Sequence, residues 1–337
     1  MAQILNPIKD IAYFLAGDIV GTKTLLQLSS TSDGRTPLLK RSYASAAHAG
    51  LAEIIKVFLL EAGIHDIAAA CFALAGPVNG RLVKLTNLPW EIDGDALAAL
   101  FSIKHVALIN DFEAVGHGIA ALQSTDVLTL QSGTEQAEGV RLVVGAGTGL
   151  GVGWLSWSQG QYHVHPSEGG HMDFSPADDL QESLLRYLQH RYGHVSYERI
   201  VSGPGLVNIF EFIRDTGLAT PTPQLIKEMK EGDAPAVITQ FSLQSDEQIA
   251  HMTVDLFLSV YGAFVGNMAL ASLPRGGIYV AGGIAGKMIK QIKRGEFLHA
   301  FLSKGRFREL LSMLPLHIVL DSGVGLIGAN VCAQQHV

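Results

Sequence analysis

Apolar and polar positions in the first third of the chain follow first a strand pattern and then a helix pattern. Ile11 to Ala16 and Thr24 to Ser29 are predicted to form paired strands, with Pro37 to Tyr43 as a third, antiparallel neighbour. Leu51 to Glu61 carries apolar residues at helical spacing and is followed by Gly63, a residue typical of helix C-caps. This region is therefore predicted to mix strands and helices.

Two nearly continuous apolar runs predict strands that are buried on both faces. They are Ile67 to Ala75 and His105 to Ile109, and the second leads directly into Asn110 and Asp111. Ligands of open α/β sheets bind beyond the carboxyl ends of such strands. Asn110 and Asp111 are therefore candidate site residues by position, although an ordinary turn followed by a helix N-cap explains the pair equally well.

The second half of the chain begins again with strands and continues with helices. The predicted strands are Val127 to Leu130, Val140 to Val144, Gly151 to Trp157 and Gly276 to Val280, and the predicted helices are Leu180 to Tyr192, Gly205 to Arg214 and Gly262 to Leu273. Asp215 to Gln248 holds several prolines and no firm pattern, which predicts loops or short helices near the surface.

Composition narrows the class of protein. A chain of 337 residues, 48% hydrophobic and 16% charged, exceeds one usual core and predicts two domains with a cleft between them. The net charge of -7 favours neither nucleic acid nor an anionic membrane as a partner. Cys71 and Cys332 are far apart in sequence, outside any metal or disulfide spacing. No apolar run is predicted to act as a signal peptide or membrane span, so we expect a cytoplasmic protein.

Two glycine-containing turns between apolar runs predict a phosphate site. One is the turn around Gly17 to Thr22, and the other is Gly145 to Gly153. The dinucleotide pattern G-x-G-x-x-G fails in the second turn, because its third position is Leu150 or Val152. A P-loop is not indicated in the first turn either, since Lys23 is misplaced and a strand-like run follows. Taken singly, each turn is explained by an ordinary hairpin, but two matched copies favour a pair that binds phosphate from two sides.

The two turns resemble the phosphate motifs of the sugar kinases in the actin, Hsp70 and hexokinase superfamily. Further segments resemble the bacterial ATP-dependent glucokinase family in collinear order from about Ala12 to Ala329. They are Leu108 to Phe112, Ser167 to Phe174, Gly193 to Arg199, Ser202 to Asn208, Ala281 to Ile284 and Lys304 to Phe307. The resemblance implies two actin-like (ribonuclease H-like) α/β domains with a substrate cleft between them. It places residues 1–121 and 320–337 in the smaller domain and residues 122–319 in the larger one.

The resemblance also implies roles for individual residues. Asp111 matches the catalytic base, and Asp18 suits a water-bridged Mg²⁺ on the phosphates of ATP. The glucose-contacting residues are matched by Asn110, Asp111, Glu168, His171 and Glu198. The ATP-binding residues are matched by Gly17, Asp18, Gly21, Thr22, Gly145, Gly147, Thr148, Gly149, Gly282 and Gly283. A homodimer is also implied.

Other interpretations of these residues remain open at the level of sequence. Glu168 and His171 are three apart, as metal ligands on one helix face would be, but Gly169 and Gly170 disfavour a helix between them. Glu198 can instead pair with a neighbouring charge at a helix end. A carboxylate, amide and imidazole set nevertheless suits a hexose, whose hydroxyls both donate and accept hydrogen bonds.

Val20 stands where the family usually has a second glycine in its first phosphate turn. A β-branched residue disfavours positive φ and narrows the approach of a phosphate. We expect an ATP-dependent glucokinase that uses Mg²⁺ and forms glucose 6-phosphate. The alternatives are a kinase for another hexose and, because of Val20, a non-catalytic sugar-binding regulatory protein.

Overall fold

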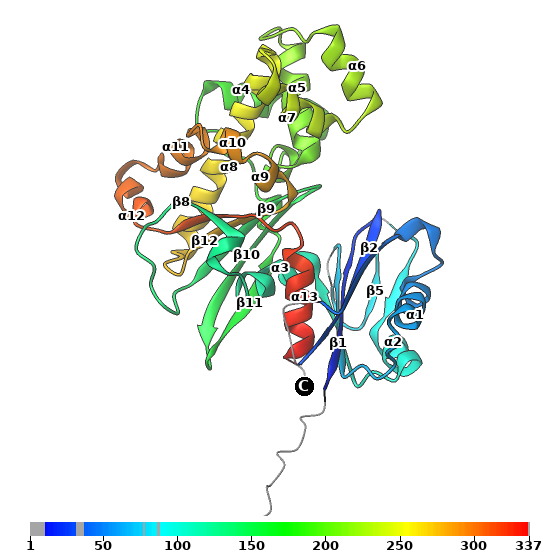
Figure 1. Ribbon diagram of the computed structural model, residues 1–337. Coiled ribbons are helices and arrows are strands. Elements are labelled where there is room, and N and C mark those ends of the chain that lie inside the picture. The colour runs from blue at the N-terminus through cyan, green and yellow to red at the C-terminus, as the bar shows by residue number, and fades with distance from the viewer. Residues whose placement is uncertain (1–10, 32–36, 77, 86–87, 336–337) are drawn as a thin grey trace, which may run out of the picture. The chain divides into compact units, whose positions relative to one another are not determined.

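The computed structural model describes residues 11–31, 37–76, 78–85 and 88–335. The ends of the expected small domain, residues 1–10 and 336–337, lie outside the described residues. The described chain divides into two compact units, one made of the residues up to Ala121 with those from Gly323 onward, and the other of Leu122–Ser322 (Figure 1).

Unit 1 is built on a five-stranded sheet with the order β3-β2-β1-β4-β7. Its strands are β1 (Tyr13–Ile19), β2 (Lys23–Ser30), β3 (Leu39–Ala44), β4 (Ala69–Leu74) and β7 (His105–Asn110), with a separate pair β5 (Leu82–Lys84) and β6 (Glu91–Asp93). β1, β4 and β7 are parallel, so their carboxyl ends meet at one edge. The helices are α1 (Leu51–Ala62), α2 (Gly94–Phe101), α3 (Asp111–Ile119) and α13 (Val324–Gln334).

Helices cover both faces of this sheet. Apolar residues of α1 and α2 share one core with the sheet, and α3 and α13 share a second core on the opposite face, as Figure 1 shows. The first core is built around large side chains such as Phe58 and Phe72, whereas the second is rich in alanine. Small residues let α13 lie close to α3 and to the sheet, and this close packing fixes the helix that begins at Asp111.

Unit 2 is built on a six-stranded sheet with the order β11-β10-β9-β12-β13-β8. Its strands are β8 (Val127–Gln131), β9 (Arg141–Ala146), β10 (Leu150–Ser158), β11 (Gln161–Ser167), β12 (Ile278–Ala281) and β13 (Leu316–Val319). Its longer helices are α4 (Asp179–Tyr192), α5 (Gly203–Asp215), α6 (Pro223–Glu231), α7 (Ala234–Gln244) and α8 (Gln248–Ser272). Shorter ones are α9 (Gly283–Lys287), α10 (Ile289–Ile292), α11 (Glu296–Leu302) and α12 (Arg308–Ser312). One large apolar core joins the helices to β9, β10, β12 and β13.

Most elements predicted from the apolar pattern are confirmed within a few residues. The three antiparallel strands, the helix ending at Gly63 with φ of 65°, and the strands β4 and β7 all form where predicted. β4 is buried throughout, as predicted, whereas β7 is only partly buried. Gly17 to Ile19, however, belong to β1 rather than to the turn. A Cβ on Gly17 would lie 2.6 Å from Phe72 Cδ1, so this glycine is required by packing inside the sheet.

The region from Asp215 to Gln248, for which loops or short helices were predicted, folds into short helices. It contains α6 and α7, and each has a proline in its first turn, Pro223 and Pro235. Proline is well accommodated there because the first helical N–H groups need no partner within the helix. The prolines that obscured the helical pattern therefore mark the points where helices begin.

Helix α8 is also longer than predicted, since it begins at Gln248 rather than near Gly262. By length and composition it could cross a membrane, contrary to the sequence-based expectation that no such span exists. However, 72% of the most apolar 18-residue stretch of α8 is buried inside the protein. Such burial is typical of a helix in the core of a water-soluble fold.

Candidate active-site residues

One group of predicted site residues lies at the β1–β2 hairpin of unit 1. The hairpin turn is closed by a hydrogen bond from Val20 N to Lys23 O (3.1 Å), and Ser45 Oγ donates to Val20 O (3.1 Å). Among the described residues, positive φ occurs at four non-glycine positions, and Val20 is not one of them. The backbone at Val20 is therefore one that a β-branched residue adopts without strain.

Asp18 lies near the end of β1, one residue before the strand ends at Ile19. Burial raises the pKa of the Asp18 carboxyl, and the positive charges of Lys23 and Lys40 offset part of that shift. A Cβ on Gly325 would lie 3.8 Å from Asp18 Oδ2 and 3.9 Å from Asp111 O, so Asp18 and the start of α3 meet beside α13. A nearby cation would stabilise the ionised form of this buried carboxylate. The position of Asp18 therefore fits the expected Mg²⁺.

Asn110 and Asp111 occupy the junction of β7 and α3. Asn110 Oδ1 accepts hydrogen bonds from Phe112 N (2.8 Å) and Glu113 N (3.2 Å), and its Nδ2 donates to Gly76 O (2.9 Å). Asn110 is thus the N-cap of α3, and Asp111 is the first residue of the helix. The N-terminal end of a helix stabilises negative charge. The capping role therefore belongs to Asn110, and the Asp111 carboxylate sits where its charge is favoured.

Another group of predicted site residues lies at the β9–β10 hairpin of unit 2, whose turn is Gly147-Thr148-Gly149. Gly147 N donates to Gly149 O (2.8 Å), and Gly203 N, at the start of α5, donates to Gly147 O (2.8 Å). Gly282 has φ of 86°, and a Cβ there would lie 2.4 Å from Ala146 O. Only glycine fits at position 282, beside the phosphate turn that the sequence predicted.

A cavity of about 750 Å³ opens beside this turn, within the size range of small-molecule sites. Its lining includes the predicted residues Gly147, Thr148 and Gly283. The remaining lining residues come chiefly from α5, α7 and α9 and include Leu206, Asp233, Thr239, Gln240, Ile284 and Lys287. The contribution of α7 to the cavity was missed, because the sequence predicted loops or short helices near the surface there and gave them no site role. The proline near the start of α7 was the available signal for this helix.

Three further predicted residues meet in unit 2. His171 Nε2 lies 4.0 Å from Glu168 Oε2 and 4.0 Å from Glu198 Oε1. Glu168 precedes a short 3-10 turn, Gly169–His171, and His171 is its last residue, so the two do not lie on an α-helix. Within the part of the chain that the structure describes, no group of three His, Cys, Asp or Glu side chains is arranged to hold a metal ion. The cluster instead offers separated polar groups at spacings that hydroxyls can bridge.

Glu198 also contacts the phosphate turn, a relationship that sequence reasoning did not reveal. Its Oε2 accepts a hydrogen bond from Leu150 N (2.9 Å), and a Cβ on Gly149 would lie 2.6 Å from the same oxygen. A side chain at position 149 would therefore displace the Glu198 carboxylate. Spacing alone gave no signal, because 48 residues separate the two partners.

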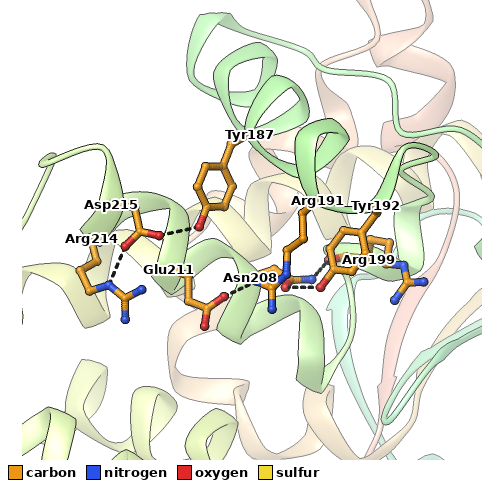
Figure 2. A network of polar contacts seen from close by, with 8 residues as sticks. All are labelled: Tyr187, Arg191, Tyr192, Arg199, Asn208, Glu211, Arg214 and Asp215. Atoms are coloured by element: carbon orange, nitrogen blue, oxygen red, sulfur yellow. Dashed lines mark hydrogen bonds and ion pairs between the residues drawn. The ribbon is translucent and has the colours of Figure 1, made fainter.

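A polar network supports the backbone at Arg199, the residue that follows Glu198 (Figure 2). Asn208 Nδ2 donates to Arg199 O (2.8 Å), and Asn208 Oδ1 accepts from Tyr192 OH (2.9 Å). The Arg199 guanidinium lies over the Tyr192 ring, 4.3 Å from its centroid. α4 and α5 therefore support the short turn Tyr197–Arg199 that carries Glu198.

Comparison with known proteins extends across nearly the whole chain. The family described as glucokinase matches residues 15–336. A curated glucokinase of Nostoc sp. is 45% identical over 95% of this chain and 98% of its own length. The crystal structure of glucokinase from an Antarctic psychrotroph matches with a TM-score of 0.83 and 26% identity, over 96% of this chain and 99% of that one.

A second solved structure, glucokinase from Balamuthia mandrillaris in complex with glucose, has a TM-score of 0.79 and 22% identity. It covers 97% of this chain and 95% of its own. These likenesses confirm the predicted fold class of two actin-like α/β domains and the resemblance on which it was based. The chain therefore belongs to the glucokinase family and is an ATP-dependent sugar kinase of the hexokinase type.

Proposed function

We propose that the protein transfers the γ-phosphoryl group of Mg-ATP to the 6-hydroxyl of glucose, giving glucose 6-phosphate and ADP. The observation that carries this proposal is the position of the Gly147–Gly149 turn within unit 2. One side of the turn borders a cavity of about 750 Å³, and the other contacts Glu198 of the carboxylate and imidazole cluster. A phosphate-binding turn between a largely apolar cavity and a polar cluster suits a kinase that binds a nucleotide and a polyhydroxylated acceptor.

The nucleotide is assigned to the cavity. Aliphatic side chains such as Leu206 and Ile284 line it and suit the faces of adenine, while Gly283 leaves room for close approach. Backbone N–H groups of the turn, with Thr148 Oγ1, suit the phosphates. On the unit 1 side we assign Asp18, Gly21 and Thr22 to the same phosphates; Gly17 and Gly145 lie within β1 and β9 and support the turns.

The hexose is assigned to Glu168, His171 and Glu198 together with Asn110 and Asp111. Carboxylate and imidazole groups in unit 2 are 4.0 Å apart, too far for direct hydrogen bonds and suited to hydroxyls placed between them. A site of this kind rejects sugars that lack a hydroxyl, because its polar groups would then be left unpaired.

Asp111 is assigned as the base that accepts the proton of the 6-hydroxyl as that oxygen attacks phosphorus. The Asn110 cap fixes the Asp111 backbone at the start of α3. The carboxylate is therefore held at the rigid junction between β7 and α3. Mg²⁺, which neutralises phosphate charge when bound, would be held by Asp18 through water. Because phosphoryl transfer depends mainly on positioning and charge neutralisation, the turns and the cap contribute as much as the base.

Val20 does not favour the alternative of a non-catalytic sugar-binding regulator. Its backbone lies outside the left-handed region, so the turn needs no glycine at this position. We further propose that the enzyme works in the cytoplasm as a homodimer in the first step of glucose breakdown. Light scattering of the purified chain tests the oligomeric state.

A coupled kinase assay across glucose, mannose, fructose and glucosamine with Mg-ATP tests the proposal. We expect kcat/KM to be highest for glucose. A higher value for another hexose would reassign the substrate, and glucose binding by calorimetry without product formation would support the regulator instead.

A further inference from the structure

The phosphate turn of unit 2 is held from both sides by different elements. Gly203 N, at the start of α5, donates to Gly147 O (2.8 Å) on the side of the cavity. On the other side, Leu150 N donates to Glu198 Oε2 (2.9 Å). Any shift of the turn must therefore change the geometry at Glu198.

The Glu198 carboxylate faces two partners at once. While Oε2 accepts the Leu150 N–H, Oε1 lies 4.0 Å from His171 Nε2, on the side assigned to the hexose. The two oxygens belong to one planar group, so a hydroxyl that binds Oε1 also fixes the direction of Oε2. The Glu198 side chain is 31% exposed, which leaves the hexose side open to a ligand.

The Glu198 carboxylate is in close contact with the Gly147–Gly149 turn, and its backbone is hydrogen-bonded to the start of α5. A Cβ on Gly149 would lie 2.6 Å from Glu198 Oε2, so the carboxylate lies directly against the turn. The Glu198 backbone is tied to α5 as well, because Ser202 Oγ donates to Glu198 O (2.7 Å) and accepts from Gly205 N (3.0 Å). The same helix lines the nucleotide cavity.

We propose that Glu198 is a positioning residue that couples hexose binding to nucleotide binding. A hexose hydroxyl on Oε1 orders the carboxylate, and the ordered carboxylate holds Leu150 N and the Gly147–Gly149 turn in the form that binds phosphate. This inference rests on the proposed function and adds a direct energetic link between its two substrates. Linkage is reciprocal, so the nucleotide must strengthen hexose binding by the same factor.

Calorimetry of glucose binding, with and without saturating Mg²⁺ and the non-hydrolysable ATP analogue AMPPNP, measures the coupling. In the unmodified chain we expect the analogue to lower the glucose Kd by about fivefold or more. In Glu198→Ala this ratio should fall to about one. Glu198→Gln retains an amide oxygen for Leu150 N and should retain part of the ratio, although its glucose affinity falls.

Glu198→Ala removes a hexose contact as well as the link, so a second pair of variants separates the two effects. Gly149→Ala places a methyl group against Glu198 Oε2 and should weaken glucose binding about fivefold or more without nucleotide. Gly286→Ala in α9, whose Cβ would have its nearest atom, Val319 O, at 3.7 Å, is the matched control and should keep glucose affinity within about twofold.

An unmodified chain that binds both ligands with a ratio of one would overturn the coupling, as would a Glu198→Ala variant with an unchanged ratio. Gly149→Ala with unchanged glucose affinity would also overturn it. A chain that binds glucose and the analogue but makes no product with Mg-ATP would refute the proposed function instead. The two failures are therefore distinguishable.

Discussion

Gly328 of α13 lies against Ala114 of α3 so closely that a Cβ at position 328 would stand 1.7 Å from the Ala114 carbonyl oxygen. The same Cβ would lie 2.6 Å from Gly118 N. Both close atoms are backbone atoms, which cannot rotate away. The position of α3, and with it Asp111, therefore depends on a glycine in a helix more than two hundred residues later in the chain.

Gly328→Ala should lower the free energy of unfolding by about 2 kcal/mol or more, because the helices must separate to admit the methyl group. Gly325→Ala is the matched control in the same helix, since its nearest atoms are in ordinary contact at 3.8 Å or more. The control should be neutral or stabilising by up to about 1 kcal/mol, as expected for alanine in place of a helical glycine. Urea unfolding measures both, and equal losses would refute the packing argument.

Asp111→Asn should bind glucose nearly as well as the unmodified chain and lower kcat by about 10²- to 10⁴-fold. The amide oxygen still accepts the Phe112 N–H that Asp111 Oδ1 accepts now (2.9 Å), so the start of α3 is preserved. Steady-state kinetics and glucose calorimetry on one preparation check this. Substantial residual turnover would exclude Asp111 as the base.

Asp18→Asn should raise stability at neutral pH and lower activity. Burial raises the pKa of Asp18 above its unfolded value of about 3.9, so the ionised form is disfavoured by folding. Above the folded pKa this cost is present in full, and below the unfolded pKa it disappears. The difference in Tm between Asp18→Asn and the unmodified chain should therefore shrink as the pH falls through the acid range. A difference that is constant with pH would show that the effect does not come from ionisation.

Val20→Gly tests whether the first phosphate turn is impaired. Because Val20 has an ordinary backbone conformation, glycine should leave the KM for ATP within about twofold and lower stability by about 0.5–1 kcal/mol through added unfolded-state entropy. A large fall in the KM for ATP would instead show that the valine side chain obstructs the phosphates.

Asn208→Ala should destabilise unit 2 and weaken glucose binding, since it removes the support of the turn that carries Glu198. Asn208 is buried and bonds Tyr192 and Arg199, so the expected loss in the free energy of unfolding is about 1–3 kcal/mol. Tyr187→Phe, at the other end of the network in Figure 2, removes only a hydrogen bond to Asp215 (2.7 Å) and is the control. It should leave glucose affinity unchanged, and equal effects on glucose binding would contradict the assigned support.

The sequence predicted the fold well where apolar residues alternate or run continuously, as in β4 and β7, and less well where helix starts contain proline, as at Pro223 and Pro235. The predicted residues of unit 2 do lie together, whereas Gly17 proved to be a packing glycine in a strand. The hydrogen bond between Leu150 N and Glu198 was not predictable. Neither residue type nor sequence spacing indicates which backbone N–H a carboxylate 48 residues away will bind.

Because α13 lies at the end of the chain, its packing against unit 1 is completed last during synthesis. Unit 1 is interrupted by the whole of unit 2, so its second apolar core lacks one helix until the last part of the chain has been synthesised. On the ribosome, the alanine-rich face of the β1–β4 sheet and the side of α3 that Gly328 covers remain exposed while more than two hundred residues are added. A product terminated before Val324 would keep unit 2 but lack a finished scaffold for Asp111. Incomplete chains of this kind are expected to bind chaperones and to be inactive.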